Sequence, residues 1–269
     1  MSKKYIFQKL NNITSLNTWI SKNWEISKNI WRLIKNKNKK PKNLSWKDFW
    51  FIHSVPVRYQ TLIFPDGTVI NKRCSDSIPN SYIKLKALEL SNNFAGKTFL
   101  DIGCAEGFFV RNAATRGAAF ARGCDIEKER IKIAKIMSKA WNIQEKTEFS
   151  VLKLYDIPPK YASDIVICLA VAHHLHGGNH DTWQIISEPK KYENAFKNML
   201  KAVNAVATLT KEITYWEYSY EYGSKKPDQI DYKKLGRIWE EKGLYRKVDF
   251  KGLLQCTEYK DRAIYHAYK

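Results

Sequence analysis

From residue 96 to the end of the chain, short apolar runs alternate with longer amphipathic stretches. The runs that we expect to form strands are 98–102, 118–125, 148–154, 164–169, 205–213, 245–254 and 263–268. The stretches with helical periodicity are 107–116, 127–141, 190–203 and 228–242. This alternation predicts an α/β domain whose mostly parallel sheet is covered by helices on both faces. Because only a short connection separates the last two strands, we expect them to pair as an antiparallel hairpin at one edge.

The first 95 residues form two further zones. Residues 1–50 contain 12 Lys and Arg against 2 acidic residues, so they carry +10 of the chain's net charge of +19. Apolar residues recur with a helical period over 13–35, which predicts a basic amphipathic helix. Two interpretations stay open, since this helix can pack on the main domain, or residues 13–40 can lie against an anionic membrane surface. Residues 51–95 are expected to form an adapter, with a β-hairpin around Pro65-Asp66-Gly67 and a helix over 81–90.

Composition narrows the class of protein. Hydrophobic residues make up 44% of the chain, which is enough for a core and excludes disorder over the whole chain. The longest apolar run, 165–172, is far shorter than the roughly 20 residues of a membrane-spanning helix, and we expect no signal peptide. The positive charge predicts an anionic partner without choosing among nucleic acid, phosphorylated metabolites and acidic lipid. The cysteines fit no zinc spacing and are expected to be buried free thiols of a cytoplasmic protein: Cys74, Cys104, Cys124, Cys168 and Cys256.

The most informative motif runs from Phe99 to Phe109 and reads Phe-Leu-Asp-Ile-Gly-Cys-Ala-Glu-Gly-Phe-Phe. An apolar strand ends in a turn of small residues and a helix follows, a geometry that lets backbone amides and a helix start approach a ligand closely. Asp125 ends the next strand, where its carboxylate can accept from both hydroxyls of a ribose. Asp156 follows the third strand, where it can accept from an adenine amino group. The spacing Gly103-x-x-x-Gly107 departs from the dinucleotide fingerprint Gly-x-Gly-x-x-Gly, so a dinucleotide oxidoreductase is the weaker interpretation.

This set of residues resembles the class I S-adenosylmethionine-dependent methyltransferases, whose Asp-x-Gly-x-x-x-Gly turn is matched by Asp101, Gly103 and Gly107. The resemblance implies a Rossmann-like fold with a seven-stranded, mostly parallel sheet, and S-adenosylmethionine (SAM) as cofactor. It implies that the two glycines flank the amino-acid end of the cofactor, that Asp125 holds the ribose and that Asp156 holds the adenine. The full set of expected cofactor-binding residues is Asp101, Gly103, Cys104, Ala105, Gly107, Phe108, Asp125, Ile126, Tyr155, Asp156 and Leu169.

A narrower resemblance rests on three segments. The turn motif, the segment Leu-Ala-Val-Ala-His-His-Leu over 169–175 and the terminal Arg-Ala-Ile-Tyr over 262–265 are similar to methyltransferases of bacterial surface polysaccharide. These include the methyltransferase half of the bifunctional kinase–methyltransferases that cap O-antigen chains. This resemblance implies methylation of a sugar hydroxyl or of a phosphate oxygen.

Candidate catalytic residues follow the fourth and fifth strands. His173 and His174 come just past the carboxyl end of the fourth strand, where ligands bind in open α/β sheets. One of them is the expected base or acceptor-orienting group, since an imidazole titrates near neutral pH. The aromatic segment 212–227 is expected to follow the fifth strand and wall the acceptor pocket, with Glu212 as a secondary candidate base. No metal is expected, because His176 and His180 lie beside Gly177-Gly178 in a predicted loop with few acidic ligands nearby.

The sequence therefore predicts a SAM-dependent methyltransferase that acts on an oxygen of an anionic acceptor, either glycan-related or phosphorylated and nucleotide-linked. Its expected location is the cytoplasm, with peripheral contact at the inner face of the membrane. One alternative is an RNA methyltransferase acting on tRNA, which the basic charge and the aromatic residues favour. Another is a SAM-binding partner subunit or membrane scaffold without catalytic activity. No RNA-binding module is recognisable in residues 1–95, so nucleic acid is the second choice of partner.

Overall fold

The computed structural model describes residues 40–71, 81–90, 94–169, 171, 174, 182–221, 230–257 and 260–269. The chain divides into two compact units, which are Met1–Pro56 with Asp66–Thr68, and Val57–Pro65 with Val69–Lys269. The expected helix within 13–35 lies outside the described residues. The expected boundary at residue 50 is wrong, because helix α2 (Trp46–Ser54) crosses it. Ser45 caps the start of that helix, because its hydroxyl accepts a hydrogen bond from the amide of Asp48. This cap was not identified from the sequence.

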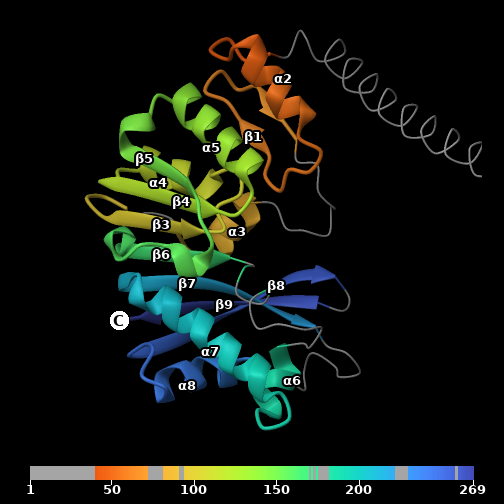
Figure 1. Cartoon of the computed structure of the whole chain (residues 1–269), viewed down its shortest axis with the longest axis vertical. Coiled ribbons are helices and arrows are strands. Elements are labelled where there is room, and N and C mark those ends of the chain that lie inside the picture. The colour runs from red at the N-terminus through yellow and green to blue at the C-terminus, as the bar shows by residue number, and fades with distance from the viewer. Residues whose placement is uncertain are drawn as a thin grey trace, which may run out of the picture. The chain divides into compact units, whose positions relative to one another are not determined.

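The larger unit is built on one seven-stranded sheet with the order β5-β4-β3-β6-β7-β9-β8 (Figure 1). Its strands are β3 (Thr98–Ile102), β4 (Phe120–Asp125), β5 (Thr147–Val151), β6 (Ser163–Leu169), β7 (Thr210–Glu221), β8 (Lys247–Thr257) and β9 (Lys260–Tyr268). The first five strands of the order are parallel, whereas β9 is antiparallel to both β7 and β8. This arrangement confirms the predicted α/β fold and the antiparallel hairpin at the edge. Strand order reverses beside β3, and in open α/β sheets such a reversal opens a crevice at the carboxyl ends of the strands.

Helices and short turns connect the strands. The helices of this unit are α3 (Ser81–Ala87), α4 (Phe108–Thr115), α5 (Lys128–Ala140), α6 (Thr182–Ser187), α7 (Glu193–Thr208) and α8 (Lys233–Glu241). The 3₁₀ turns are η2 (Gln144–Lys146), η3 (Leu154–Asp156) and η4 (Pro159–Tyr161). The expected adapter hairpin is present as two short antiparallel strands, β1 (Leu62–Ile63) and β2 (Val69–Ile70).

Alternating side chains of the central strands enter two different cores. On β3, Phe99 packs with residues of α3, α4 and α5, whereas Leu100 and Ile102 pack with residues of α6, α7 and α8. On β6, Ile165 and Ile167 join the first core, and the intervening residues of that strand join the second. Since successive residues of a strand face opposite sides, continuous apolar runs are what a sheet covered on both faces requires.

The expected strand at 205–213 is wrong in its bounds. Helix α7 continues to Thr208, because Val203, Val206 and Ala207 repeat at helical spacing and are all buried. Strand β7 starts only at Thr210 and runs to Glu221, so much of the expected aromatic loop is strand. Of the described helices, none has the length and apolar character needed to cross a membrane.

Candidate functional site

The turn between β3 and α4 has a backbone that few residues can adopt. Gly103, Ala105 and Gly107 all have positive φ, at 79°, 47° and 75°. A Cβ at Gly103 would lie 2.2 Å from Cγ2 of Val171, and one at Gly107 would lie 2.6 Å from the ring of Phe149. Glycine is therefore required at both positions, by backbone conformation and by space. Ala105 adopts the same left-handed region at a conformational cost.

The amides of this turn are already engaged by the protein. Gly103 donates to the carbonyl of Cys124 at 2.8 Å, and Ala105 donates to Oδ2 of Asp125 at 2.9 Å. Phe108, the first residue of α4, donates to Oε1 of Gln60 at 2.8 Å. The first amide of the helix is thus hydrogen-bonded to a glutamine that lies 48 residues away in the sequence.

Asp101 supplies an unsatisfied acceptor beside the turn. Its side chain is buried, and among the described residues its Oδ2 has no hydrogen-bond partner. Burial, followed by the nearby Asp125 carboxylate, raises the pKa of Asp101 well above its usual value, and the Lys84 ammonium opposes this shift. A buried carboxyl oxygen without a partner is suited to a cationic donor such as an ammonium group.

Asp125 and its neighbours form the second part of the site. Asp125 is buried at the end of β4, where its Oδ1 accepts from the amide of Glu127 at 2.9 Å. Each carboxylate oxygen has two lone pairs, so Asp125 retains capacity for further donors such as ribose hydroxyls. The next residue, Ile126, is 63% exposed, and Val151, which is in register with Asp125 on β5, is 50% exposed. Two exposed apolar side chains beside a buried carboxylate offer a surface for a flat, partly apolar group such as a purine.

The third part of the site is the short helix η3. Tyr155 and Asp156 are both exposed there, directly after β5. The ammonium of Lys201 lies 4.9 Å from the centre of the Tyr155 ring. The structure thus brings the expected residues of β3, β4 and η3 to the carboxyl ends of neighbouring strands. An unpartnered carboxyl oxygen, a ribose-accepting carboxylate and exposed apolar side chains together fit an aminoacyl nucleoside.

The sequence profile of a protein family described as "Methyltransferase domain" matches residues 93–243, which is more than half of the chain. The chain belongs to this methyltransferase family. Its cofactor is S-adenosyl-L-methionine, and the resemblance inferred from the turn motif is confirmed. The matched range begins just before β3 and ends just after α8, so it contains all three parts of the site.

Individual relatives of the methyltransferase match over shorter stretches. The chain is 29% identical over 126 residues to an O-antigen chain terminator bifunctional methyltransferase/kinase of Escherichia coli, covering 45% of this chain and 16% of that protein. It is 25% identical over 95 residues to a ubiquinone biosynthesis O-methyltransferase of Neisseria meningitidis, covering 35% of this chain and 40% of the relative. The chain therefore spans less than half the length of these curated relatives.

A solved structure shares the fold of the methyltransferase. The bifunctional kinase-methyltransferase WbdD superposes with a TM-score of 0.55 at 18% identity, over 82% of this chain and 45% of that chain. At this level of identity the superposition supports the fold of the sheet and its helices and nothing finer.

The expected catalytic histidines are only partly described. His174 is exposed, and its amide donates to the carbonyl of Val171, the residue that packs over Gly103. His173, His176 and His180 lie outside the described residues. Within the part of the chain that is described, no group of three His, Cys, Asp or Glu side chains is arranged to hold a metal ion. Leu169 ends β6 half-buried, at the same edge of the sheet as the turn.

Glu212 does not lie where the sequence interpretation put it. It is near the start of β7, at the opposite end of the strand from the cofactor, and forms an exposed ion pair with Lys97. The glutamate of β7 that lies level with the end of β6 is Glu217, which is in register with Leu169. The difference arises because β7 begins several residues later than expected, after a longer α7.

Glu217 is fully buried between two cations. Lys84 of α3 contacts its Oε2 at 2.7 Å, and Arg262 of β9 contacts its Oε1. Burial by itself raises the pKa of Glu217, but the two cations more than offset this and the net pKa is lowered. A carboxylate that is held ionised and enclosed in this way is a poor proton acceptor, so Glu217 is not offered as a base. The sequence interpretation missed it because its partners lie 133 and 45 residues away.

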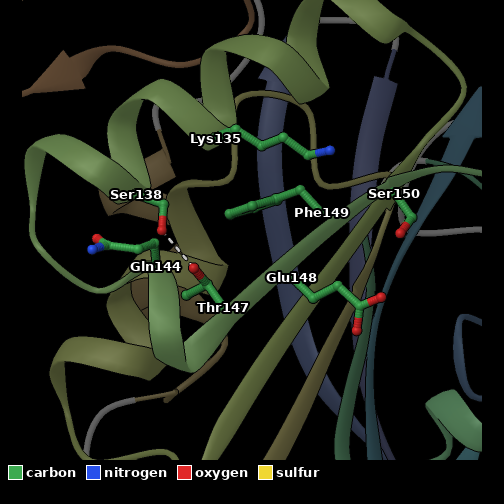
Figure 2. A pocket seen from close by; sticks show the side chains of 7 residues that line it. All are labelled: Lys135, Ser138, Gln144, Thr147, Glu148, Phe149 and Ser150. Atoms are coloured by element: carbon green, nitrogen blue, oxygen red, sulfur yellow. Dashed lines mark hydrogen bonds between the residues drawn. The ribbon is translucent and has the colours of Figure 1, made fainter.

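A cavity of about 410 Å³ lies elsewhere on the methyltransferase, between α5 and the edge strand β5 (Figure 2). Lys135 and Ser138 of α5 and Phe149 of β5 are among its lining residues, and Figure 2 shows Ser138 hydrogen-bonded to Thr147. Neither the turn residues nor Asp125 line it, although the ring of its lining residue Phe149 packs against Gly107 of the turn.

The buried cysteines agree with expectation where they are described. Cys104, Cys124 and Cys168 are buried thiols that form no disulfide. Burial, followed by the carboxylate of Asp101, raises the pKa of both Cys104 and Cys124. The thiols of Cys104 and Cys124 are therefore protonated and unreactive at neutral pH. Cys74 and the side chain of Cys256 lie outside the described part of the structure.

Proposed function

We propose that this methyltransferase transfers the methyl group of SAM to an oxygen of an anionic acceptor that is glycan-related, phosphorylated or nucleotide-linked. The observation that carries the proposal is the match of 126 residues to an O-antigen chain terminator. The match to a ubiquinone O-methyltransferase supports an oxygen as the methylated atom. The net charge of +19 supports an acceptor that carries negative charge.

Different residues of the site would bind different parts of the cofactor. SAM, when bound, supplies an activated methyl group on a sulfonium. Asp101 offers its unpartnered oxygen to the ammonium of the amino-acid end, and Asp125 offers its remaining lone pairs to the ribose. Ile126 and Asp156 serve the purine, the first by apolar contact and the second as a hydrogen-bond acceptor. Methyl transfer of this kind depends chiefly on alignment of the acceptor and exclusion of water.

The need for a base depends on the acceptor. A sugar hydroxyl must lose its proton as the new bond to carbon forms, whereas a phosphate oxygen is already anionic and needs only to be oriented. We propose His173 and His174 as the groups that take this proton or orient the acceptor. Loss of transfer in at least one of the His173→Ala and His174→Ala variants, with SAM binding retained, is the expected result. Full transfer rates in both variants would remove the histidines from the reaction.

A transfer assay with SAM labelled on its methyl group tests the acceptor class. Phosphosugars, nucleotide sugars and unmodified tRNA are the three acceptor panels, and the label is expected in one of the first two. Phosphorus NMR of the product then separates a phosphate methyl ester from a sugar methyl ether. Label in tRNA alone would replace the proposal with RNA methylation. Tight SAM binding without transfer to any panel or to a cell extract would favour a non-catalytic SAM-binding subunit.

We further propose that the protein acts in the cytoplasm, at the inner face of the membrane, with contact through residues 13–40. Support comes from the adjoining helix α2, where Trp46 and Trp50 lie one turn apart and are 55% and 41% exposed. Tryptophan favours the membrane–water interface, and the exposed Lys47 between them favours anionic headgroups. Flotation of the full chain with anionic vesicles, lost on Trp46→Ala with Trp50→Ala, is expected. Absence of flotation in the unaltered protein would end this part of the proposal.

A further inference from the structure

The side chain of Gln60, in a segment that precedes the seven-stranded sheet in the sequence, contacts the turn between β3 and α4. The carboxamide of Gln60 is buried, and its Nε2 donates to the carbonyl of Cys104 at 3.1 Å. Its Oε1 accepts from the amide of Phe108 at 2.8 Å. A single side chain thus bridges the two ends of the turn, and it does so with one donor and one acceptor that only an amide provides.

The same segment is joined to the turn by a second connection. Glu106 is fully buried within the turn, where its Oε1 accepts from the amide of Tyr59 at 3.1 Å and its Oε2 accepts from the amide of Gln60 at 3.0 Å. The guanidinium of Arg111 donates to the carbonyl of the same glutamate. Tyr59, Gln60 and Glu106 are called the clamp below. All three belong to the larger unit of the chain.

The segment that carries the clamp is itself fixed to the domain. The guanidinium of Arg130 on α5 lies 4.3 Å from the centre of the Tyr59 ring. The indole of Trp141, after the same helix, donates to the carbonyl of Ile63 at 2.9 Å. The segment with Tyr59 and Gln60 is therefore attached to α5 and to the residue that follows it, as well as to the turn.

The turn needs support of this kind. Three of its residues have positive φ, and one of them is Ala105, for which that conformation is strained. Gly107 stands at the start of α4 without a side chain to cap the helix, so Gln60 caps it from 48 residues away. Without the hydrogen bonds from Tyr59 and Gln60, the Phe108 amide and the Glu106 carboxylate would lose these partners inside the fold, and the turn would relax away from its present shape.

We propose that Gln60 and Glu106 are positioning residues for SAM, because the clamp keeps residues 103–108 in the conformation that receives the cofactor. They act through the turn and leave the contacts with the cofactor to Asp101 and Asp125. The inference rests on SAM being the cofactor but is independent of the acceptor. It predicts that clamp variants lose SAM affinity at temperatures where they are fully folded.

The experiment measures SAM binding by calorimetry on the full-length chain, together with a thermal melt of each variant. Gln60→Glu retains the acceptor for Phe108 but places an oxygen against the carbonyl of Cys104, and Gln60→Met loses both hydrogen bonds at similar volume. Either change is expected to weaken SAM binding about tenfold. Gln144→Glu is the matched control, since Gln144 is exposed and belongs neither to the turn nor to the clamp, and the affinity of this variant should stay within about twofold of the unaltered chain.

Glu106→Gln tests the other half of the clamp, with the exposed Glu145→Gln as its control. It should weaken SAM binding and increase hydrogen exchange at the amides of 103–108 at a temperature well below its melting point, effects that a purely structural role would not produce. Unchanged affinity in folded Gln60 and Glu106 variants would overturn the proposal. So would unfolding of all three variants, because the residues would then be general determinants of the fold. Failure of the unaltered chain to bind SAM would instead refute the cofactor assignment.

Discussion

Replacing Glu217 with glutamine tests the buried ion cluster that this β7 residue forms with Lys84 and Arg262. The carboxylate is fully buried and neutralises both Lys84 and Arg262, whose side chains are 11% and 15% exposed. The substitution retains the shape of the side chain but leaves two largely buried cations without a counter-charge. Breaking a buried ion pair by removing one partner typically costs about 3–5 kcal/mol, and the remaining amide oxygen places this case near the lower figure. For a unit of this size, about 3 kcal/mol corresponds to a melting temperature lower by about 6–12 °C.

The matched control lies on the same strand. Glu212 pairs with Lys97 but is 49% exposed, so solvent screens the pair. The same Glu→Gln change there should cost about 1 kcal/mol at most and lower the melting temperature by about 4 °C or less. Differential scanning calorimetry of both variants measures the contrast. Equal shifts in melting temperature would show that burial does not determine how much each carboxylate contributes to stability, and the reasoning would fail.

Acid should remove the difference between Glu217→Gln and the unaltered protein. The pKa of Glu217 in the folded state is lowered from its usual 4.5, so its ionised form is favoured by folding. Its contribution to stability is complete above that usual pKa and is lost as the pH falls through the lower folded-state pKa. The gap in unfolding free energy should therefore be constant from pH 7 to about 5 and narrow below 4.5. A gap that stays constant into strong acid would contradict the assignment.

Three further predictions concern the cofactor site. Gly103→Ala should abolish SAM binding in calorimetry, because the new Cβ would lie 2.2 Å from Cγ2 of Val171. Adding Val171→Ala removes this overlap but should restore only part of the binding, because about 1–2 kcal/mol of backbone strain remains at φ 79°. Full recovery in the double variant would show that only the overlap matters. Asp101→Asn should raise the melting temperature of the cofactor-free protein while weakening SAM binding, because burial and Asp125 raise the folded-state pKa of Asp101, and a carboxyl with a raised pKa costs stability at any pH above its unfolded-state pKa. A lower melting temperature in scanning fluorimetry would contradict this. Ile126→Ser should leave the melting temperature nearly unchanged, since Ile126 is 63% exposed, and weaken SAM binding several-fold; unchanged affinity would exclude Ile126 from the purine surface.

Local sequence patterns were sufficient to predict most of the fold and the central residues of the site. The period of the apolar residues distinguished the strands from the helices of the sheet, and the turn motif placed Asp101, Gly103 and Gly107 together because they are neighbours in the chain. Asp125 could be assigned from its position at the end of a strand, since parallel strands bring their carboxyl ends to one edge.

Errors arose where a local pattern had two interpretations. The apolar residues at 205–208 suit a strand and a helix equally. In the structure they form the last turn of α7, because Val206 and Ala207 are buried on the same helix face as Val203. Because β7 therefore starts at Thr210, Glu212 lies near the beginning of the strand and not near its end. Glu217 is the glutamate that lies level with the end of β6, on the cofactor side of the sheet. The boundary at residue 50 failed for a related reason, since α2 is short and lacks a clear apolar period.

The sequence by itself determined the alternation of elements, the parallel sheet with its terminal hairpin, and a turn that suits a SAM-dependent methyltransferase. It determined these because periodicity and turn chemistry depend on residues close together in the chain. Tertiary structure alone decided that Gln60 caps α4 and that Glu217 lies between Lys84 and Arg262. A buried donor, acceptor or charge must find a partner, and which partner it finds depends on how distant segments fold together.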